Sequence, residues 1–177
     1  MIKNFILNMF GKVPYSIEKL RKSGVIVGEN VYIGTRKIDL DHGFLLEIGN
    51  NVTLSDCRIL LHDASTKMFI GYSKVGKVVI GDNVFIGADA IILPNVRIGN
   101  NVIIGAGAVV AKNIPDNSIA VGNPIRIIGS TSEYISKNEN MIKLGAKVYK
   151  TYSSEKTEEE KKKMRSELSD GEIGFDI

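Results

Sequence analysis

An aliphatic residue returns at every sixth position along the middle of the chain, without interruption, over residues 80 to 110. The leading residues of these six-residue blocks are Ile80, Ile86, Ile92, Ile98, Ile104 and Val110. The fifth position of each block is also small or aliphatic, and four further blocks in the same register begin at Val27, Ile33, Ile48 and Leu54. A helix would repeat its apolar positions about every 3.6 residues and an alternating strand every two, so the pattern fits neither.

A period of six fits a short strand followed by a turn, and three such units make one triangular coil of about 18 residues. The leading aliphatic residues then stack from coil to coil at the spacing of neighbouring strands, ~4.8 Å. Pairs of Gly with Asn or Asp fall at the corners, where positive φ is cheap for Gly and tolerated by Asn and Asp. The sequence therefore predicts an all-β chain whose core, residues 24–129, is a parallel β-helix.

The repeat is interrupted twice, at residues 39–47 and again at residues 61–79. A regular solenoid does not need such insertions, and loops on rigid scaffolds often carry function. A tolerated surface insertion remains the alternative. On either side of the repeat we expect a helical cap over residues 1–23 and a charged helical tail over residues 130–177, with a capping box formed by Thr157 and Glu160.

Composition excludes several classes of function. The formal charge of +3 is too small and too dispersed to predict a nucleic-acid partner. Cys57 is the only cysteine, so neither an intrachain disulfide nor a cysteine-based metal site is expected. No apolar run approaches the ~18 residues of a membrane span, and the N-terminal segment lacks a signal-peptide pattern. We therefore expect a cytoplasmic protein without an integral membrane segment.

The two histidines of the chain, His42 and His62, fall in the two interruptions. An imidazole can take a proton from a hydroxyl and return it later, so His62 at the start of the longer loop is the candidate general base. Asp63 beside it could orient the ring. His42 could help to hold an acceptor or could pack against a neighbouring aromatic ring, and Asp39 and Asp41 could accept hydrogen bonds from sugar hydroxyls or form turns.

Small corner residues and two cations mark the C-terminal coils, in the stretch IGAGAVVAKNIPDNSIAVGNPIRII. Small side chains would let a pantetheine arm lie along a coil, while Lys112 and Arg126 could meet phosphates. A solenoid also needs small corners for its own packing, so this signal is weak from the residues alone. A metal site of the carbonic anhydrase type would require three histidines, and we expect no metal.

Residues 25–129 resemble the hexapeptide-repeat acyltransferases, especially the maltose, galactoside and xenobiotic acetyltransferase group. The resemblance is carried by IGNNVTL, LLHDAST and the run VGKVVIGDNVFIGADAIILPNVRIGNNVIIGAGAVVAKNIPDNSIAVGNPIRII. Within that group the chain looks most like bacterial cell-surface polysaccharide O-acetyltransferases. The resemblance implies a left-handed β-helix, acetyl-CoA as co-substrate, a saccharide acceptor, and a homotrimer with its sites between subunits.

Carried over residue by residue, the resemblance implies that His62 is the catalytic base. The candidate acceptor-side residues, Asp41, His42 and Asp63, rest on their places in the two interruptions and not on the resemblance. The implied contacts to acetyl-CoA are Ala88, Ala106, Ala111, Lys112 and Arg126. The chain departs from the family pattern in three places. Gly129 stands where a second cation is common, Ala111 stands where Thr is common, and the 61–79 loop lacks the Glu of the galactoside and maltose enzymes.

The sequence thus predicts an O-acetyltransferase that acts on a sugar hydroxyl, in the synthesis of cell-surface polysaccharide or lipopolysaccharide. N-acetylation of an amino-sugar nucleotide and acylation of serine remain as enzymatic alternatives. A non-catalytic scaffold or an ice-binding solenoid is a further alternative, although an ice-binding face would require repeated Thr where this chain has aliphatic residues.

Overall fold

The computed structural model describes residues 14–169 and 171–177, and the described chain forms two compact units that divide between Thr131 and Ser132. Of the helix expected near the N-terminus, the described part is α2 (Ile17–Lys22), and the rest of that expectation, up to residue 13, lies outside the described residues. Among the described helices, none combines the length and apolar character that a bilayer crossing requires.

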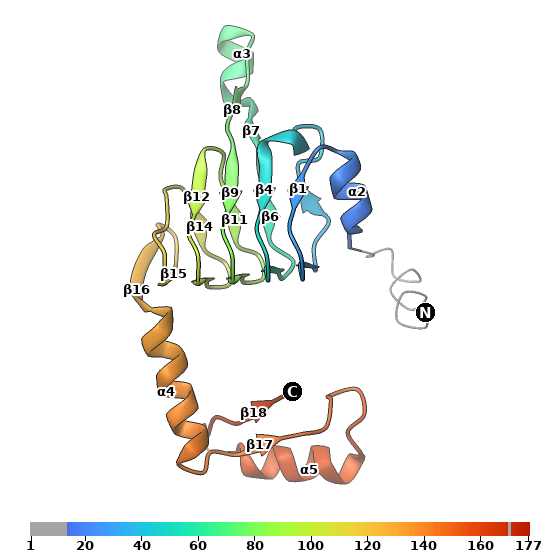
Figure 1. Cartoon of the computed structure of the whole chain (residues 1–177), viewed down its shortest axis with the longest axis vertical. Coiled ribbons are helices and arrows are strands. Elements are labelled where there is room, and N and C mark those ends of the chain that lie inside the picture. The colour runs from blue at the N-terminus through green and yellow to red at the C-terminus, as the bar shows by residue number, and fades with distance from the viewer. Residues whose placement is uncertain (1–13, 170) are drawn as a thin grey trace. The chain divides into compact units, whose positions relative to one another are not determined.

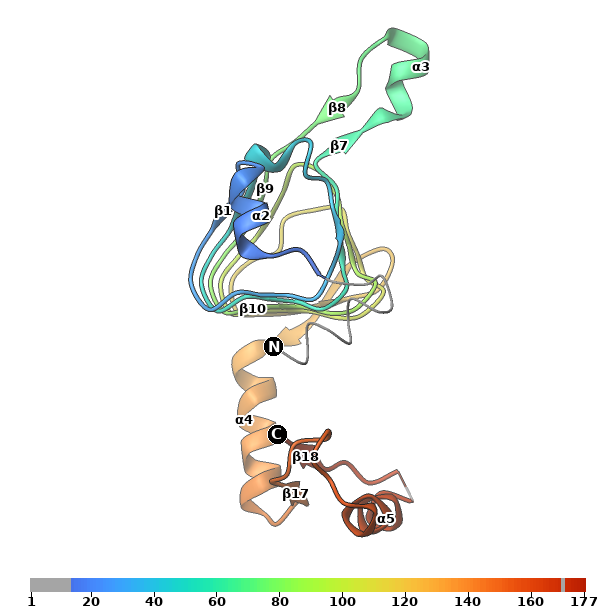
Figure 2. The same cartoon turned by 90° about the vertical axis from the view of Figure 1, so that its right-hand side faces the viewer.

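The first unit is a triangular solenoid whose three faces are sheets (Figures 1 and 2). The first sheet holds β1 (Ile26–Val27), β4 (Leu46–Ile48), β9 (Val78–Ile80) and β12 (Val96–Ile98). The second sheet holds β2 (Tyr32–Ile33), β5 (Thr53–Leu54), β10 (Val84–Ile86), β13 (Val102–Ile104), β15 (Ser118–Val121) and β16 (Arg126–Ser130). The third sheet holds β3 (Lys37–Ile38), β6 (Arg58–Ile59), β11 (Ile91–Ile92) and β14 (Val109–Val110).

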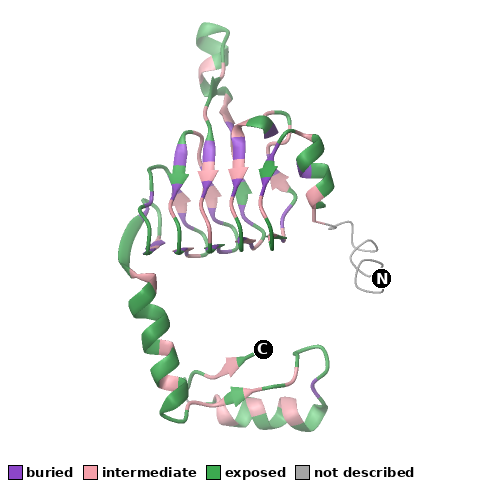
Figure 3. Ribbon diagram, in the orientation of Figure 1, coloured by how far each residue is buried: buried purple, intermediate pink, exposed green. Residues whose placement is uncertain are grey.

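Strand register confirms that the leading aliphatic residues stack inside this prism. In the first sheet, Ile48 pairs with Ile80, which pairs with Ile98. The second sheet aligns Leu54, Ile86 and Ile104, and the third aligns Ile59, Ile92 and Val110. These side chains are at most 2% exposed and form the core, and Figure 3 shows the buried segments repeating from coil to coil. Each fully buried aliphatic side chain contributes about 1.5–3 kcal/mol, so the stack is the main source of stability.

The corner between the first and second sheets carries a ladder of asparagines, which we call the asparagine corner. Asn51, Asn83 and Asn101 occupy consecutive coils with φ between 53° and 56°. The Nδ2 atom of Asn51 donates to Oδ1 of Asn83 at 3.0 Å, and Nδ2 of Asn83 donates to Oδ1 of Asn101 at 3.1 Å. The amides therefore satisfy one another along the axis while tolerating the left-handed backbone.

The glycines of this corner have a different role from the one predicted. The expectation that their φ is positive is wrong for Gly81, since Asn83 two positions later adopts that conformation. A Cβ atom on Gly81 would lie 2.6 Å from Oδ1 of Asn100 and 2.8 Å from the carbonyl oxygen of Gly99 in the next coil. Glycine is required there because the backbones of successive coils approach too closely for any side chain.

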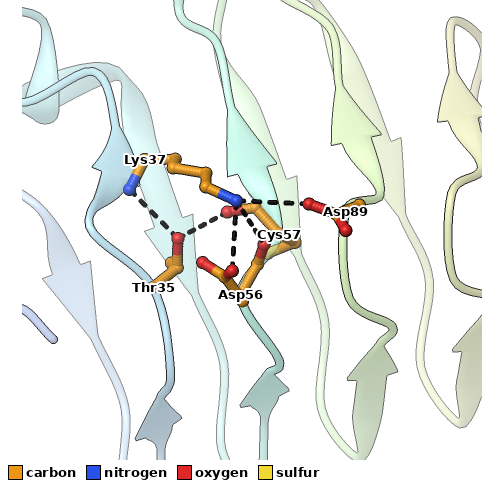
Figure 4. Close-up of polar contacts among 5 residues, drawn as sticks. All are labelled: Thr35, Lys37, Asp56, Cys57 and Asp89. Carbon is orange, nitrogen blue, oxygen red and sulfur yellow. Dashed lines mark hydrogen bonds and ion pairs between the residues drawn. The ribbon is translucent and has the colours of Figure 1, made fainter. Parts of the chain in front are cut away.

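The corner between the second and third sheets, which we call the lysine corner, is tied by polar contacts across three coils (Figure 4). Nζ of Lys37 lies 3.1 Å from Asp56 and 3.2 Å from Asp89, and hydrogen bonds to these carboxylates raise the pKa of Lys37. The buried Thr35 hydroxyl donates to the carbonyl oxygen of Cys57 at 2.6 Å. Burial raises the pKa of the Cys57 thiol to about 12, so this thiol stays protonated and serves as core packing.

Both ends of the solenoid are covered. At the N-terminal end Leu20 of α2 is fully buried, and Nη2 of Arg21 donates to the carbonyl oxygen of Val27 at 3.0 Å. At the other end β16 turns back and pairs antiparallel with β15, whereas the other strand pairs of the three sheets are parallel. These elements cover backbone groups that a bare terminal coil would leave unpaired.

The predicted insertions 39–47 and 61–79 extend too far, because Leu46 and Glu47 belong to β4 and Val78 and Val79 belong to β9, which pair in the first sheet. The part of the second insertion that leaves the prism is an arm over residues 62–75 (Figure 2). Its base is an antiparallel pair, β7 (His62–Asp63) with β8 (Lys74–Val75). Its tip holds a 3-10 turn at Ala64–Thr66 and the short helix α3 (Lys67–Ile70). Because the arm is anchored at both ends by the solenoid, the residues at its base have fixed positions.

The second unit contains α4 (Thr131–Lys143, which begins in the first unit), β17 (Val148–Tyr149), α5 (Glu158–Glu167) and β18 (Phe175–Asp176). The predicted capping box of Thr157 and Glu160 is confirmed, with both reciprocal hydrogen bonds present. Strands β17 and β18 pair in parallel, and the buried ammonium of Lys156 lies 2.7 Å from Asp176. The tail is thus a small folded unit with its own ion pair.

Candidate active site

The third corner of the prism, between the third and first sheets, is where both insertions leave the repeat, and we call it the histidine corner. Asp39 and His42 follow β3, while His62 follows β6 in the next coil. Because β3 and β6 pair in register, with Ile38 opposite Ile59, the residues that follow them meet at the same corner. Two segments about twenty residues apart in the sequence are therefore brought side by side.

Asp39 lies between the two imidazole rings. Its Oδ2 atom accepts a short hydrogen bond from Nδ1 of His62 and lies 3.2 Å from Nδ1 of His42. The ring centroids of His42 and His62 are 4.9 Å apart, and their planes are inclined at 39°. The Asp39 side chain is 8% exposed, against 39% for His62. The carboxylate is thus sheltered from solvent, and the His62 ring is more open to it.

The charges at this corner stabilise the ionised form of Asp39. Burial alone would raise the pKa of this carboxyl group, and burial is the largest single influence on it. The hydrogen bond from His62 and the charges of His62 and His42 together outweigh burial, so the pKa of Asp39 lies below its ordinary value. An ionised Asp39 that accepts from Nδ1 of His62 leaves the lone pair of the neutral ring on Nε2.

Asp63 does not hold the His62 ring in this structure. Its carboxylate accepts from the backbone nitrogen of Ser65 at 2.9 Å and pairs with Nζ of Lys74 at 2.9 Å. These contacts, the one to Lys74 above all, hold the pKa of Asp63 well below its usual range. Successive side chains on a strand point to opposite sides, so Asp63 points away from the side occupied by His62 and braces the arm.

The remaining acceptor-side candidates lie nearby on the first insertion. Asp41 is exposed, and His42 lies with its ring centroid 6.3 Å from that of Phe44. His42 therefore has both of the contacts considered from the sequence, an aromatic neighbour and a polar position beside His62. The structure brings His42 and His62 together and places Asp63 elsewhere.

The residues expected to contact acetyl-CoA fall at two different corners. Ala111 and Lys112 follow β14 and so lie at the histidine corner, further along the axis than His62. Ala88 and Ala106 precede strands of the third sheet and lie at the lysine corner, where the amide of Gly107 donates to the carbonyl oxygen of Ala88 at 2.9 Å. All four are exposed, as is Arg126 at the start of β16.

The role of Asp39 is the feature of this corner that sequence reasoning missed. Asp39 was considered as a sugar contact, and the partner of His62 was sought in the adjacent Asp63. A signal was nevertheless present, because the two insertions leave the repeat after strands of the third face in successive coils, β3 before Asp39 and β6 before His62. This signal places both side chains at one corner but does not show their contact, since Asp39 directly follows β3 whereas His62 lies three residues after the end of β6.

Comparison with known proteins agrees with the period-six fold. Residues 77–112 match the family model described as bacterial transferase hexapeptide (six repeats). Protein CapG of Staphylococcus aureus is 41% identical over 133 residues, which cover 69% of this chain and 75% of CapG. The chain belongs to the hexapeptide-repeat transferase family. Its fold is the left-handed parallel β-helix of that family.

Two further relatives are named acetyltransferases. The crystal structure of a maltose O-acetyltransferase from Clostridium difficile 630 is 35% identical, with a TM-score of 0.46, and the match covers 63% of this chain and 72% of that one. A probable serine acetyltransferase 5 of Oryza sativa subsp. japonica is 41% identical over 105 residues, 56% of this chain and 31% of the relative. The chain thus spans about a third of the serine enzyme. This chain is an enzyme of the acyltransferase class.

Proposed function

We propose that this protein transfers the acetyl group of acetyl-CoA to a hydroxyl group of a saccharide, with His62 as the general base. One observation carries the proposal: a solvent-open imidazole at the base of the arm, whose Nδ1 is bound by the sheltered carboxylate of Asp39. The maltose O-acetyltransferase relative supports an O-linked acceptor of the sugar class. A role in cell-surface polysaccharide or lipopolysaccharide synthesis, carried out in the cytoplasm, completes the proposal.

The proton transfers follow from the tautomer of His62. Nε2 accepts the proton of the acceptor hydroxyl as its oxygen attacks the carbonyl carbon of the thioester. Asp39 stabilises the imidazolium that forms and keeps the ring in orientation. When the carbon–sulfur bond breaks, the proton on Nε2 passes to the departing thiolate, which leaves as coenzyme A. Backbone N–H groups near the site would stabilise the oxyanion.

Acetyl-CoA would bind as a co-substrate along the exposed small corners, with its phosphates toward Lys112 and Arg126. Ala88 and Ala106 lie at the lysine corner and His62 lies at the histidine corner. Within one copy of the chain, the third face therefore separates these two expected acetyl-CoA contacts from the proposed base. A neighbouring copy that brings its lysine corner against the histidine corner would complete the site. We therefore propose a homotrimer, a closed symmetry in which each site lies between two copies.

The arm supports this assembly. Its exposed apolar side chains are Met68, Phe69, Ile70, Tyr72 and Val75, with exposed fractions from 57% to 82%. Apolar surface gathered on a projecting hairpin favours burial against another protein surface. In the proposed trimer the arm would lie over the neighbouring copy and shield the thioester from water.

The test is a panel of sugars, sugar nucleotides and oligosaccharides incubated with acetyl-CoA, with release of coenzyme A and product mass both measured. Wild-type protein is expected to yield an ester, and the His62→Ala variant to lose about 10²–10⁴-fold in rate because the general base is absent. A His62→Ala variant that folds normally and keeps its rate would remove His62 from the mechanism. Absence of acetyl-CoA binding to the wild type would favour a scaffold.

Serine is the second candidate acceptor. The serine acetyltransferase relative is 41% identical to this chain over 105 residues, and CapG is 41% identical over 133 residues. Including free serine and an amino-sugar nucleotide in the panel separates the candidates. An O-acetylserine product would identify a serine enzyme, while an acetamide product stable to mild base would identify an N-acetyltransferase.

Assembly is tested separately by light scattering coupled to size-exclusion chromatography. The expected mass is three times that of one chain, and replacing Phe69 and Tyr72 with Ser is expected to weaken the assembly. A wild-type monomer at micromolar concentration that is fully active would contradict a site shared between copies.

A further inference from the structure

Three potential ligand atoms converge at the histidine corner. Asp39, His42 and His62 each offer one such atom, and these atoms all lie within 4.8 Å of one another. Among the described residues, this is the one group of three or more His, Cys, Asp or Glu side chains with that property. Both rings turn Nδ1 toward the same carboxylate, at 3.2 Å for His42 and closer for His62.

The donor set has a definite chemical preference. Two neutral imidazoles with one carboxylate suit Zn²⁺, Co²⁺, Ni²⁺ and Fe²⁺, whereas Mg²⁺ and Ca²⁺ prefer all-oxygen sites. Ligands of one ion at ~2.1 Å stand about 3 Å apart when adjacent, so small ring movements suffice to admit an ion among these atoms.

The site is also partly built and partly open. The Asp39 side chain is 8% exposed, while those of His42 and His62 are 31% and 39% exposed. The carboxylate is held directly after β3 and contacts Nδ1 of both rings, so the fold already brings the ligands together and little entropy is lost in organising them. Water can enter from the exposed side and fill the remaining coordination positions, as in zinc sites with three protein ligands.

We propose that Asp39, His42 and His62 form a binding site for one divalent transition-metal ion per chain, and that the bound ion reversibly inhibits the enzyme. The ion takes the place of the proton that Nδ1 of His62 shares with Asp39. A ring that coordinates a cation through Nδ1 is a poorer base at Nε2, and Asp39 can no longer stabilise its protonated form. The inhibition, unlike the binding, rests on the proposed function of His62.

Binding is tested on metal-free full-length protein, without acetyl-CoA or acceptor. Calorimetric titration with ZnCl₂ and visible absorbance during titration with CoCl₂ should both show one equivalent per chain. His42→Gln is expected to raise the Zn²⁺ dissociation constant at least about 10-fold, since losing a ligand costs no less than losing an outer-shell partner. Asp39→Asn should do the same. Thermal unfolding of each metal-free variant checks that it folds.

The matched control is Asp63→Asn, which removes a carboxylate one residue from His62 that is paired with Lys74 instead. Its Zn²⁺ affinity is expected to stay within about threefold of wild type, since Asp63 is not a ligand. No saturable Zn²⁺ or Co²⁺ binding by wild type, or a folded His42→Gln variant with unchanged affinity, would overturn the proposal. Since binding is measured without turnover, its failure and the failure of acetyl transfer are separate results.

If acetyl transfer is found, equimolar Zn²⁺ should inhibit the wild type, a chelator should restore it, and His42→Gln should need far more Zn²⁺ for the same fractional inhibition. Binding that leaves the wild-type rate unchanged would overturn the inhibitory part alone.

Discussion

The asparagine corner and the histidine corner belong to the same coils and have opposite properties. At the asparagine corner each coil repeats the last, with Asn51, Asn83 and Asn101 bonded to one another along the axis. At the histidine corner two coils depart from the repeat, and Asp39 and His62 fill the space with ionisable groups. The regular corner stabilises the prism, and the irregular one uses that rigidity to hold a carboxylate against an imidazole.

After the loss of His62 itself, the largest expected effect comes from Asp39→Asn at the histidine corner. The amide keeps the shape of the side chain but cannot stabilise a protonated His62, so the rate of acetyl transfer should fall by about 10- to 10³-fold. The loss should appear in kcat, with KM for the acceptor little changed, because Asp39 stabilises the His62 ring most when the ring takes up the proton in the transition state. A purely structural role for Asp39 would instead lower the melting temperature and leave kcat of the folded fraction near that of the wild type.

At the asparagine corner the sharpest test is Gly81→Ala. The added Cβ would meet Oδ1 of Asn100 and the carbonyl oxygen of Gly99 at 2.6 and 2.8 Å, so successive coils must move apart. We expect the free energy of unfolding to fall by about 1–3 kcal/mol, measured by urea denaturation. Gly129→Ala is the matched control, since its Cβ would meet no atom within 4 Å. Equal stability of the two variants would contradict close coil approach as the reason for Gly81.

Thr35→Val tests the lysine corner, whose contacts are drawn in Figure 4. Valine keeps the shape of threonine but removes the hydroxyl that donates to the carbonyl oxygen of Cys57 at 2.6 Å. An acceptor left without a partner in a buried position costs about 1–2 kcal/mol, which denaturant unfolding would register. Thr35→Ser keeps the hydroxyl and loses only the methyl group, so it should be more stable than Thr35→Val. Equal stability of the two variants would contradict the hydrogen bond as the main contribution of Thr35.

The smallest effect is expected for Asn83→Ala on the asparagine ladder. The side chain is exposed, and its two hydrogen bonds to neighbouring asparagines compete with water, so the loss should be about 1 kcal/mol. Part of it comes from placing Ala at a φ of 56°. Asn83→Gly separates the contribution of the hydrogen bonds from that of the backbone, because glycine adopts this backbone conformation readily and the variant loses only the two side-chain hydrogen bonds. Acetyl transfer should be unchanged in both variants, which distinguishes this corner from the one at Asp39.

The period of six was enough to predict the stacked strands, because only one arrangement buries Ile80, Ile86 and Ile92 together while turning after each. His62 could be found because it stands where the repeat stops. Its partner could not be found by proximity in sequence, since Asp39 lies 23 residues away and meets His62 only through the pairing of β3 with β6. The function of Gly81 was misjudged because a turn sequence alone does not reveal how close the next coil lies.

The reversal of the chain at β16 also bears on solubility. A stack of strands that ended at β15 would expose a straight row of unpaired N–H and C=O groups, onto which a second molecule could add as one more coil, and a third onto that. By pairing antiparallel with β15, β16 occupies that edge. Because β16 covers this edge, further molecules cannot add strands to this end of the second sheet and assemble into fibres.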